Sequence, residues 1–358
     1  MFFAAFVIAA QFGKGGVAKK LIPSCTFVPL VIVVTGKGNA RTDGKHKHWR
    51  EDSMKRVVVL GALITIGALS VAVSAYQAPA AQPKVVQVDK LKDNLYVLKG
   101  GGGNTTVFIG ANGVTVVDTK LAGWGAPILG KIKELTPKPV TRIINTHSHG
   151  DHVSGNPEFP ATVEIIAHAN TVKNVEAWPP VYGLNNPFPN VIKDAGGKGL
   201  PKRTFTDKLT VGSGAEQIDL FYFGRAHTSG DAWVLFPALR TLVAGDVFPN
   251  KSVPIMDKNA GGSGVDFPAT LAKAYSTVTA VDVIVTGHAP TTMTRDDLRM
   301  YGDFIKEFVA AAQEAKKAGK SADDFAASWK VPEKFTGYPP AQAAGVKNAA
   351  QVVMDETR

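Results

Sequence analysis

Cysteine is almost absent from this sequence. Cys25 is the single residue of this type among 358, and it lies in a segment that we expect to be missing from the mature protein. The rest of the chain therefore forms no disulfide and offers no thiolate as nucleophile or metal ligand. Any metal chemistry must use nitrogen and oxygen side chains. A body without cysteine is also compatible with export into an oxidising compartment.

Acidic residues are outnumbered, but the imbalance is local. The chain carries 40 Lys and Arg against 30 Asp and Glu, a net charge of +10. Residues 1–75 hold ten of these cations and three of the anions, so residues 76–358 carry a net charge of only +3. Since a duplex-binding protein needs a basic surface, nucleic acid is not an expected partner. We expect a small-molecule substrate instead.

The positive charge of the amino-terminal part belongs to a targeting segment. Met54-Lys55-Arg56 precedes an apolar run at residues 57–73, and Val73-Ser74-Ala75 follows as a small-x-small pattern. This order predicts a secretory signal peptide at residues 54–75. The alternative is a membrane anchor, but about 17 apolar residues is at the short limit for crossing a bilayer. We therefore expect cleavage, a periplasmic or secreted protein, and no stable membrane insertion afterwards.

Residues 1–53 lie upstream of this signal peptide. They combine an apolar start with a basic, Gly-rich stretch. Because a signal peptide normally opens its chain, we predict that translation begins at Met54 and that residues 1–53 are a non-native extension.

The mature chain opens with a linker at residues 76–89, which contains a stretch rich in Pro, Ala and Gln. Short β-type runs separated by Gly and Asn overlap its end and follow it, at residues 85–88, 95–98, 105–109 and 114–117. A helical pattern at residues 121–135 stops before Pro137. Residues 140–144 then read as a buried strand that leads directly into Thr146 and His147.

A weak internal sequence similarity suggests two similar halves. The apolar run at residues 241–244 ends near Asp246, as residues 114–117 end at Asp118. Likewise residues 281–285 end near His288, as residues 142–144 end near His147. Each half would then deliver polar residues from strand ends to a shared edge. Chance similarity between apolar strands is the alternative.

The carboxy-terminal region is helical. From Thr294 onward, Thr294 and Asp297 resemble a capping box, and Lys316, Lys317 and Gly319 supply the end signals. We predict a helical extension at residues 296–358, in which residues 321–358 form one or two short helices around a loop at 331–340. The first helix has one apolar stripe, made of Leu298, Tyr301, Phe304, Ile305, Phe308 and Val309.

The sequence Thr146-His147-Ser148-His149-Gly150-Asp151-His152 is the strongest indication of function. In a loop leaving a strand, His147 and His149 point to one side, while Asp151 and His152 turn toward a second point. Imidazole and carboxylate together suit Zn²⁺. A solvated His-rich loop is the alternative, but the preceding strand and the glycine favour a metal loop. His168 lies outside this scheme, and we interpret it as structural.

This HxHxDH motif resembles that of the metallo-β-lactamase superfamily, over about residues 90–295. The resemblance implies an α/β fold, a four-layer αββα sandwich, here with helices added at the carboxy terminus. It also implies that His227, in Ala226-His227-Thr228-Ser229-Gly230-Asp231, joins His147 and His149 at a first zinc. Asp151, His152 and His288 would hold a second zinc, Asp246 would bridge both, and Asp118 would support the loop from behind.

The resemblance implies a hydrolase in which two Zn²⁺ ions supply hydroxide at neutral pH and Asp151 orients it. We expect an exported enzyme that cleaves an ester, thioester, lactone or amide bond. β-Lactamase activity in the narrow sense and an iron-dependent dioxygenase on the same fold are alternatives. A purely structural zinc site is disfavoured because such sites are usually rich in Cys.

Three departures narrow the resemblance. True β-lactamases of the superfamily place Cys or Ser where Asp246 stands. Glyoxalase II and the related persulfide dioxygenases follow that Asp with a Gly-rich, Arg-containing stretch, which residues 247–251 do not match. Homoserine-lactone lactonases have a Tyr at the position of Pro249. What remains is similar to exported members that keep all seven ligands.

A long insert at residues 176–206 separates two ligand-bearing segments. It contains Trp178, Tyr182 and Phe188 among several prolines. We predict that these aromatics form a lid over the metals and favour a substrate with an apolar or ring-shaped part. An ordinary surface loop packed on its own aromatic residues is the alternative.

Overall fold

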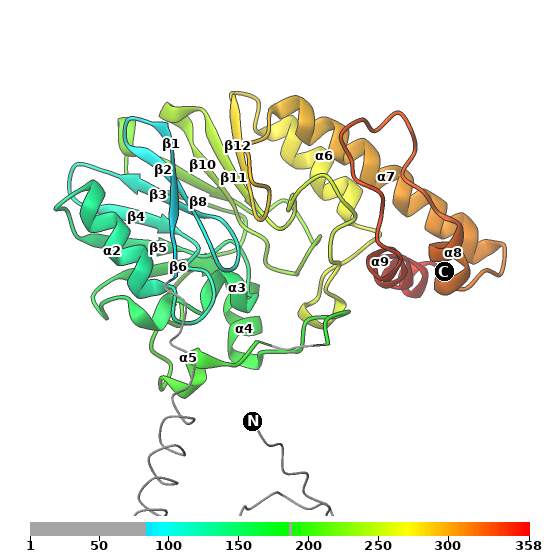
Figure 1. Ribbon diagram of the computed structural model, residues 1–358, viewed down its shortest axis with the longest axis horizontal. Coiled ribbons are helices and arrows are strands. Elements are labelled where there is room, and N and C mark those ends of the chain that lie inside the picture. The colour runs from blue at the N-terminus through cyan, green and yellow to red at the C-terminus, as the bar shows by residue number, and fades with distance from the viewer. Residues whose placement is uncertain (1–83, 186–187) are drawn as a thin grey trace, which may run out of the picture. The chain divides into compact units, whose positions relative to one another are not determined.

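Two β-sheets form the centre of the fold, as Figure 1 shows for the computed structural model, which describes residues 84–185 and 188–358. In the seven-stranded sheet the spatial order follows the chain. Strands β1 to β4 are antiparallel neighbours, and β4 to β7 run parallel. Its strands are β1 (Gln87–Lys92), β2 (Leu95–Lys99), β3 (Thr105–Ile109), β4 (Val114–Val117), β5 (Val140–Ile144), β6 (Glu164–His168) and β7 (Arg203–Phe205).

The five-stranded sheet has the order β12-β11-β10-β9-β8. Its members are antiparallel except for the parallel pair of β11 and β12. They are β8 (Lys208–Val211), β9 (Ile218–Phe221), β10 (Trp233–Phe236), β11 (Thr241–Gly245) and β12 (Val283–Thr286).

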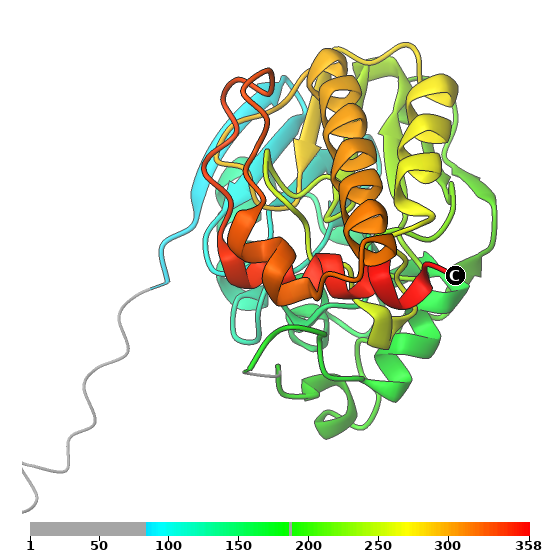
Figure 2. The ribbon, with the colours of Figure 1, turned by 90° about the vertical axis from the view of Figure 1, so that its right-hand side faces the viewer.

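Helices belong to the outer layers and to the connections. The α-helices are α2 (Gly125–Leu135), α3 (Gly150–Val153), α4 (Ala169–Ala177), α5 (Val191–Asp194), α6 (Phe267–Thr277), α7 (Arg295–Lys317), α8 (Ala322–Ser328) and α9 (Ala343–Glu356). Short 3₁₀ turns are η1 (Asn156–Glu158), η2 (Gly214–Glu216), η3 (Pro237–Leu239) and η4 (Lys258–Ala260). Figure 2 shows α6, α7 and the carboxy-terminal helices on one side of the sheets.

Three apolar cores separate the layers. Ile128 and Ile132 of α2 pack on one face of the first sheet, where they meet Val107 and Val116. The opposite face, which includes Phe108, packs on the second sheet. Successive residues of a strand face opposite sides, so one apolar run can serve both cores. A third core joins the second sheet to α6, α7 and α9. The predicted αββα sandwich with carboxy-terminal helices is thereby confirmed.

The internal similarity in the sequence corresponds to two parallel strand pairs. Strands β4 and β5 pair in parallel, with Val117 opposite Ile144. Strands β11 and β12 also pair in parallel, with Gly245 opposite Thr286. Because parallel strands end at the same edge, each pair brings an aspartate and a histidine together. The halves contribute Asp118 with His147, and Asp246 with His288.

Some element limits differ from the sequence expectation. Helix α2 begins at Gly125, not at 121, because Lys120 and Gly123 have left-handed φ angles of 66° and 77°. Strand β1 covers Gln87–Lys92 and not 85–88. The capping box of α7 is confirmed, since the side chains of Thr294 and Asp297 exchange hydrogen bonds with each other's backbone N–H.

The division of the chain into domains stays a prediction, although β1 and α7 begin close to the expected limits at residues 90 and 296. The proposed extension at 1–53 and signal peptide at 54–75 lie outside the described residues. None of the helices within 84–185 and 188–358 combines the length and apolar character needed to cross a bilayer.

Candidate metal centre

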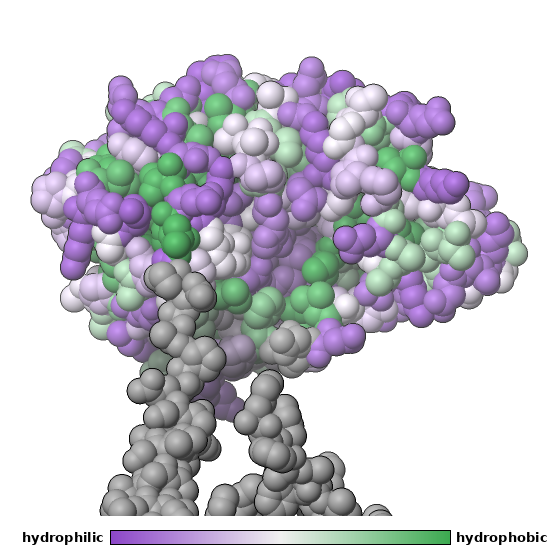
Figure 3. Space-filling model, viewed as in Figure 1, coloured by the Kyte–Doolittle hydropathy of each residue, from purple (hydrophilic) through white to green (hydrophobic). Residues whose placement is uncertain are grey.

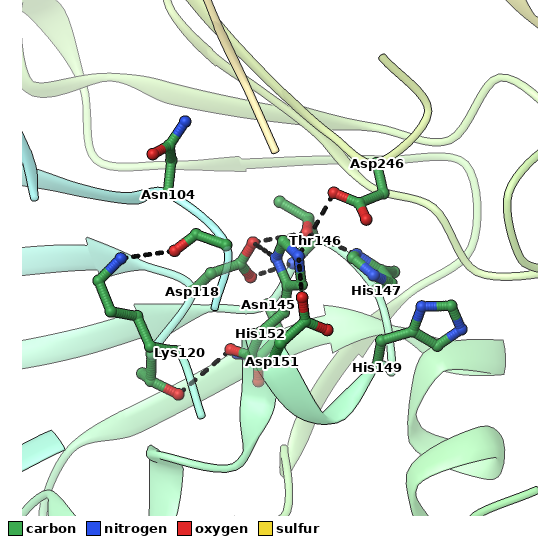
Figure 4. Close-up of polar contacts among 12 residues, drawn as sticks. Asn104, Asp118, Lys120, Asn145, Thr146, His147, His149, Asp151, His152 and Asp246 are labelled. Carbon is green, nitrogen blue, oxygen red and sulfur yellow. Dashed lines mark hydrogen bonds and ion pairs between the residues drawn. The ribbon is translucent and has the colours of Figure 1, made fainter. Parts of the chain in front are cut away.

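The loop after β5 carries four of the predicted ligands, and Asp118 holds it in place from the end of β4. Its carboxylate accepts hydrogen bonds from the Thr146 backbone N–H at 2.8 Å and from the Thr146 hydroxyl at 2.7 Å. It also lies 2.7 Å from Nδ1 of His152. Figure 4 shows these contacts of Asp118, whose supporting role stays a prediction.

Three histidines and one aspartate form the first cluster of potential ligands. His147, His149, His227 and Asp246 each offer one atom, and these atoms lie within 4.8 Å of one another. Nδ1 of His149 is 3.0 Å from Nε2 of His227. The other ring nitrogen of His227 lies 2.7 Å from the Ile255 carbonyl oxygen. Such an outer partner fixes which nitrogen faces a metal.

The second cluster contains Asp151, His152 and His288. Nε2 of His288 lies 3.3 Å from Oδ2 of Asp151 and 3.4 Å from Nε2 of His152. His152 is fully buried, whereas the side chain of His288 is 33% exposed. This cluster is therefore the more open of the two.

Asp246 lies between the clusters. Its carboxylate oxygens are 3.3 Å from Nε2 of His152, 3.1 Å from Nε2 of His288 and 3.8 Å from Nε2 of His227. The position is what a bridging ligand needs, because one carboxylate reaches donor atoms of both clusters.

Two buried atoms in this centre lack a hydrogen-bond partner in the described part of the chain. They are Nε2 of His147 and Oδ1 of Asp246. Buried polar atoms normally form hydrogen bonds, so two buried atoms without one, among seven convergent donors, fit a cation. Imidazole and carboxylate are the ligands that zinc and other first-row metals accept. The residues present thus suit a divalent metal.

Electrostatics favour a cation at the same place. Burial lowers the pKa of His147 well below 6.5, so its imidazole is neutral, the form that binds metals. Burial alone would raise the pKa of Asp246, but His288 and His152 hold it well below its usual value. Asp246 in turn raises the pKa of His288 to about 9. A bound metal ion would take the place of the proton that Asp246 stabilises on His288.

Three residues that no sequence pattern predicts also belong to this region: Asp257, Asn104 and Lys120. Oδ2 of Asp257 lies 2.9 Å from Nε2 of His149. The Asn104 side chain donates to the Thr286 and Ala289 carbonyls, on either side of the His288 loop. Lys120 is completely buried two residues after Asp118. No local pattern marks them, since each acts across long separations in sequence.

The aromatic insert packs beside the first cluster. Nε1 of Trp178 donates to the Phe188 carbonyl at 2.8 Å, and the Tyr182 backbone N–H donates to Asp257 at 3.0 Å. A cavity of about 20 Å³ remains between this insert, His149 and Gly150. That volume holds roughly one water, so the insert lies close against the metal loop. Its role as a lid stays a prediction.

The face of the molecule drawn in Figure 3 has an uneven surface. In the space-filling view, hydrophilic side chains line a hollow near the middle of the face, and hydrophobic ones gather along its lower edge (Figure 3). An apolar rim beside polar groups is typical of a small-molecule site.

A comparison with protein families identifies the chain. The family model for the metallo-beta-lactamase superfamily matches residues 98–288, which is more than half of the sequence. The chain belongs to this superfamily. The matched region contains all seven candidate ligands named above, and it ends at His288.

The individual members of the superfamily that resemble this chain have low sequence identity to it. The chain is 27% identical over 175 residues to "Metallo-beta-lactamase type 2" of Elizabethkingia meningoseptica, an alignment that covers 45% of this chain and 61% of the relative. Two solved structures share the fold: the DIM-1 metallo-beta-lactamase, with a TM-score of 0.50 and 17% identity, and a metallo-beta-lactamase from Pontibacter korlensis, with 0.50 and 16%. Each alignment covers 62% of this chain, and 97% and 99% of the respective structure.

Proposed function

We propose that this protein is an exported, zinc-dependent hydrolase that cleaves an ester, thioester, lactone or amide bond in a small molecule. The observation that carries the proposal is the convergence of seven side chains with nitrogen or oxygen donors, Asp246 among them, in which two buried atoms lack a hydrogen bond. Family membership supports metal-dependent hydrolysis as the reaction type. Zinc, export and the bond cleaved are parts of the proposal.

When bound, a pair of zinc ions lowers the pKa of coordinated water toward about 7 and so supplies hydroxide. The protein's own residues would then do the rest. His147, His149 and His227 would hold one ion, Asp151, His152 and His288 the other, and Asp246 both. Asp118 keeps His152 oriented through its Nδ1 contact.

Asp151 has the properties of the group that orients the attacking water. Its side chain is 15% exposed, so water can reach it. Burial by itself would raise the pKa of Asp151, but His152 and His288 hold it below 3.8. An ionised carboxylate at this place can accept a hydrogen bond from water and fix its direction.

Asp246 bears on the choice of substrate. An aspartate at the bridging position, instead of Cys or Ser, favours a broader class of ester or amide cleavage over β-lactam hydrolysis. The relative named "Metallo-beta-lactamase type 2" keeps β-lactam cleavage as the second candidate. Iron at the same ligands would instead favour a dioxygenase.

A substrate screen tests the proposal directly. Zinc-loaded protein should hydrolyse at least one compound among lactones, thioesters, esters and amides, and a chelator should abolish the reaction. Turnover of β-lactams alone would establish the second candidate. Metal analysis of protein produced with zinc and iron both present should find zinc, and a stoichiometric iron content would contradict the hydrolase. Amino-terminal sequencing of the native protein should find a start near residue 76, and a start near Met1 would refute export.

A further inference from the structure

Lys120 places a buried ammonium group beside the candidate second metal site. Its side chain has no exposed surface, and its Nζ donates to the Gly103 carbonyl oxygen at 2.5 Å. Figure 4 shows the side chain reaching to this carbonyl on the far side of Asp118 from His147. A buried ammonium without a partner is strongly destabilising, so the contact with Gly103 fixes both groups.

The segment that Lys120 holds touches every ligand of the second cluster or its immediate neighbours. We call residues 102–104 the glycine clamp. The Gly103 backbone N–H donates to the Asp151 carbonyl at 3.0 Å. A Cβ atom at Gly103 would lie 2.2 Å from Cε1 of His152, so only glycine permits this approach. The Asn104 backbone N–H donates at 2.7 Å to Gly287, which precedes His288.

The turn that carries Lys120 is strained. Asp118 and Lys120 both have left-handed φ angles, 61° and 66°, which Asp adopts more readily than Lys does. Thr119 between them donates from its backbone N–H to the His152 carbonyl at 2.7 Å. Such strain persists only where the surroundings fix the conformation. Lys120 is therefore held from both sides, by its backbone and by its ammonium.

We infer that Lys120 is a positioning residue for the second metal site, which acts by fixing the glycine clamp against Asp151, His152 and the His288 loop. The inference rests on the proposed two-metal function. Within 84–185 and 188–358, no hydrogen bond joins the clamp to His147, His149 or His227. The effect of Lys120 should therefore fall on one metal and spare the other.

Stepwise Zn²⁺ binding to the purified protein tests this inference. The variant Lys120→Met keeps the length of the side chain but removes the charge and the donor. We expect its second zinc to bind about 10–100-fold more weakly in competition with a chromophoric chelator, as for other residues that support ligands. The affinity for the first zinc should stay at the wild-type value. Loss of stability alone would not produce this split.

A matched control exists at the opposite end of β3. There Nζ of Lys138 donates to the Gly110 carbonyl at 2.8 Å, from a partly buried position. Lys138→Met removes the same kind of contact at the end of β3 that is remote from the candidate ligands. Both zinc affinities should equal those of the wild type, and a weakened second site in this variant would overturn the inference.

A second variant covers the case in which Lys120→Met does not fold. Asn104→Ala removes the two side-chain bonds of the clamp to the Thr286 and Ala289 carbonyls. It should also weaken only the second zinc. The positioning role is refuted if the variants that fold bind the second zinc as tightly as the wild type does. It is also refuted if they lose affinity for both zinc ions equally. A wild-type protein that binds one zinc would instead refute the proposed two-metal centre, whatever Lys120 does.

Discussion

Asp257 and His149 are 108 residues apart in the chain, yet Oδ2 of the carboxylate lies 2.9 Å from Nε2 of the imidazole. The contact leaves Nδ1 of His149 directed at the first cluster, where it lies 3.0 Å from Nε2 of His227. Oδ1 of the same carboxylate accepts the Tyr182 N–H, so one side chain joins a candidate metal ligand to the aromatic insert.

Replacing this carboxylate should weaken the first metal site. Asp257→Asn keeps the shape of the side chain but removes its charge, and we expect about 10–100-fold weaker binding of the first zinc. Chelator competition measures the change. Asp282→Asn is the control, because Asp282 pairs with Arg240 at 2.7 Å on the exposed surface, where ion pairs contribute little. An unchanged affinity in Asp257→Asn would rule out the supporting role.

Removal of the bridging carboxylate should have the largest effect. Asp246→Ala takes away the group that reaches both clusters, so bound zinc should fall below two ions per chain. Turnover should fall by more than about 100-fold, since even residues behind the ligands account for about 10–100-fold. His168→Ala is the control, because His168 bonds to Thr206 and Asn170 and offers no ligand atom to either cluster. Full activity in Asp246→Ala would refute the assignment.

The aromatic insert should affect substrate binding and leave metal content alone. Trp178→Ala removes an aromatic side chain and its bond to the Phe188 carbonyl. If the insert covers the substrate, KM should rise about tenfold, the equivalent of roughly 1.4 kcal/mol. Trp329→Ala, which removes an aromatic contact with Phe304 and Phe308 in the carboxy-terminal core, should lower stability without changing KM. Deletion of residues 178–189 with unchanged KM across a substrate panel would end the lid hypothesis.

Lys120 predicts a particular dependence of stability on pH. Burial lowers the pKa of Lys120 from 10.5 to about 8, against the opposing effects of Asp118 and Asp151. Between pH 8 and 10.5 the unfolded state holds the proton more tightly, so the free energy of unfolding rises with pH. For metal-free protein, the wild type should gain up to about 3 kcal/mol relative to Lys120→Met across this window. Urea titrations at pH 7.5, 9 and about 10.5 measure the difference, and a flat profile would contradict the lowered pKa.

The long carboxy-terminal helix begins at a capping box that can be removed without touching the metal centre. Thr294→Ala loses the side-chain acceptor for the Asp297 N–H at 3.1 Å. The free energy of unfolding should fall by about 1 kcal/mol, as for other helix caps. Urea denaturation measures it, and zinc content should be unchanged. A loss of zinc in this variant would mean that α7 takes part in the site.

Local patterns were sufficient to predict the elements that carry the ligands. The strands at Thr105–Ile109, Val114–Val117 and Val140–Ile144 were expected at these limits, because apolar runs between turn residues define them. The grouping of His147 and His149 followed from their spacing at the end of a strand. The start of α2 was missed because left-handed residues before it, such as Gly123, leave no trace in the apolar pattern.

Contacts between distant segments could not be predicted in the same way. Asp257 lies in a loop with no apolar periodicity, and its meeting with His149 depends on how the two sheets pack. Lys120 lies in a segment whose residue types are typical of an exposed turn. Its complete burial depends on the glycine clamp, which packs over it. In the sequence, Asn104 is typical of a hairpin turn. Its contact with the end of β12 becomes visible only in the folded structure.

The division of ligands between the two sheets has a mechanical consequence. Four candidate ligands follow β5 of the first sheet, whereas His227, Asp246 and His288 come from the second half of the chain. With metal bound at these residues, the sheets could not slide apart unless the ions lost one set of ligands. Bound metal would thus act as a crosslink across the sandwich, and a chelator would behave toward this domain as a mild denaturant. Amide exchange in β4 and in β11 should then quicken together as free zinc is withdrawn.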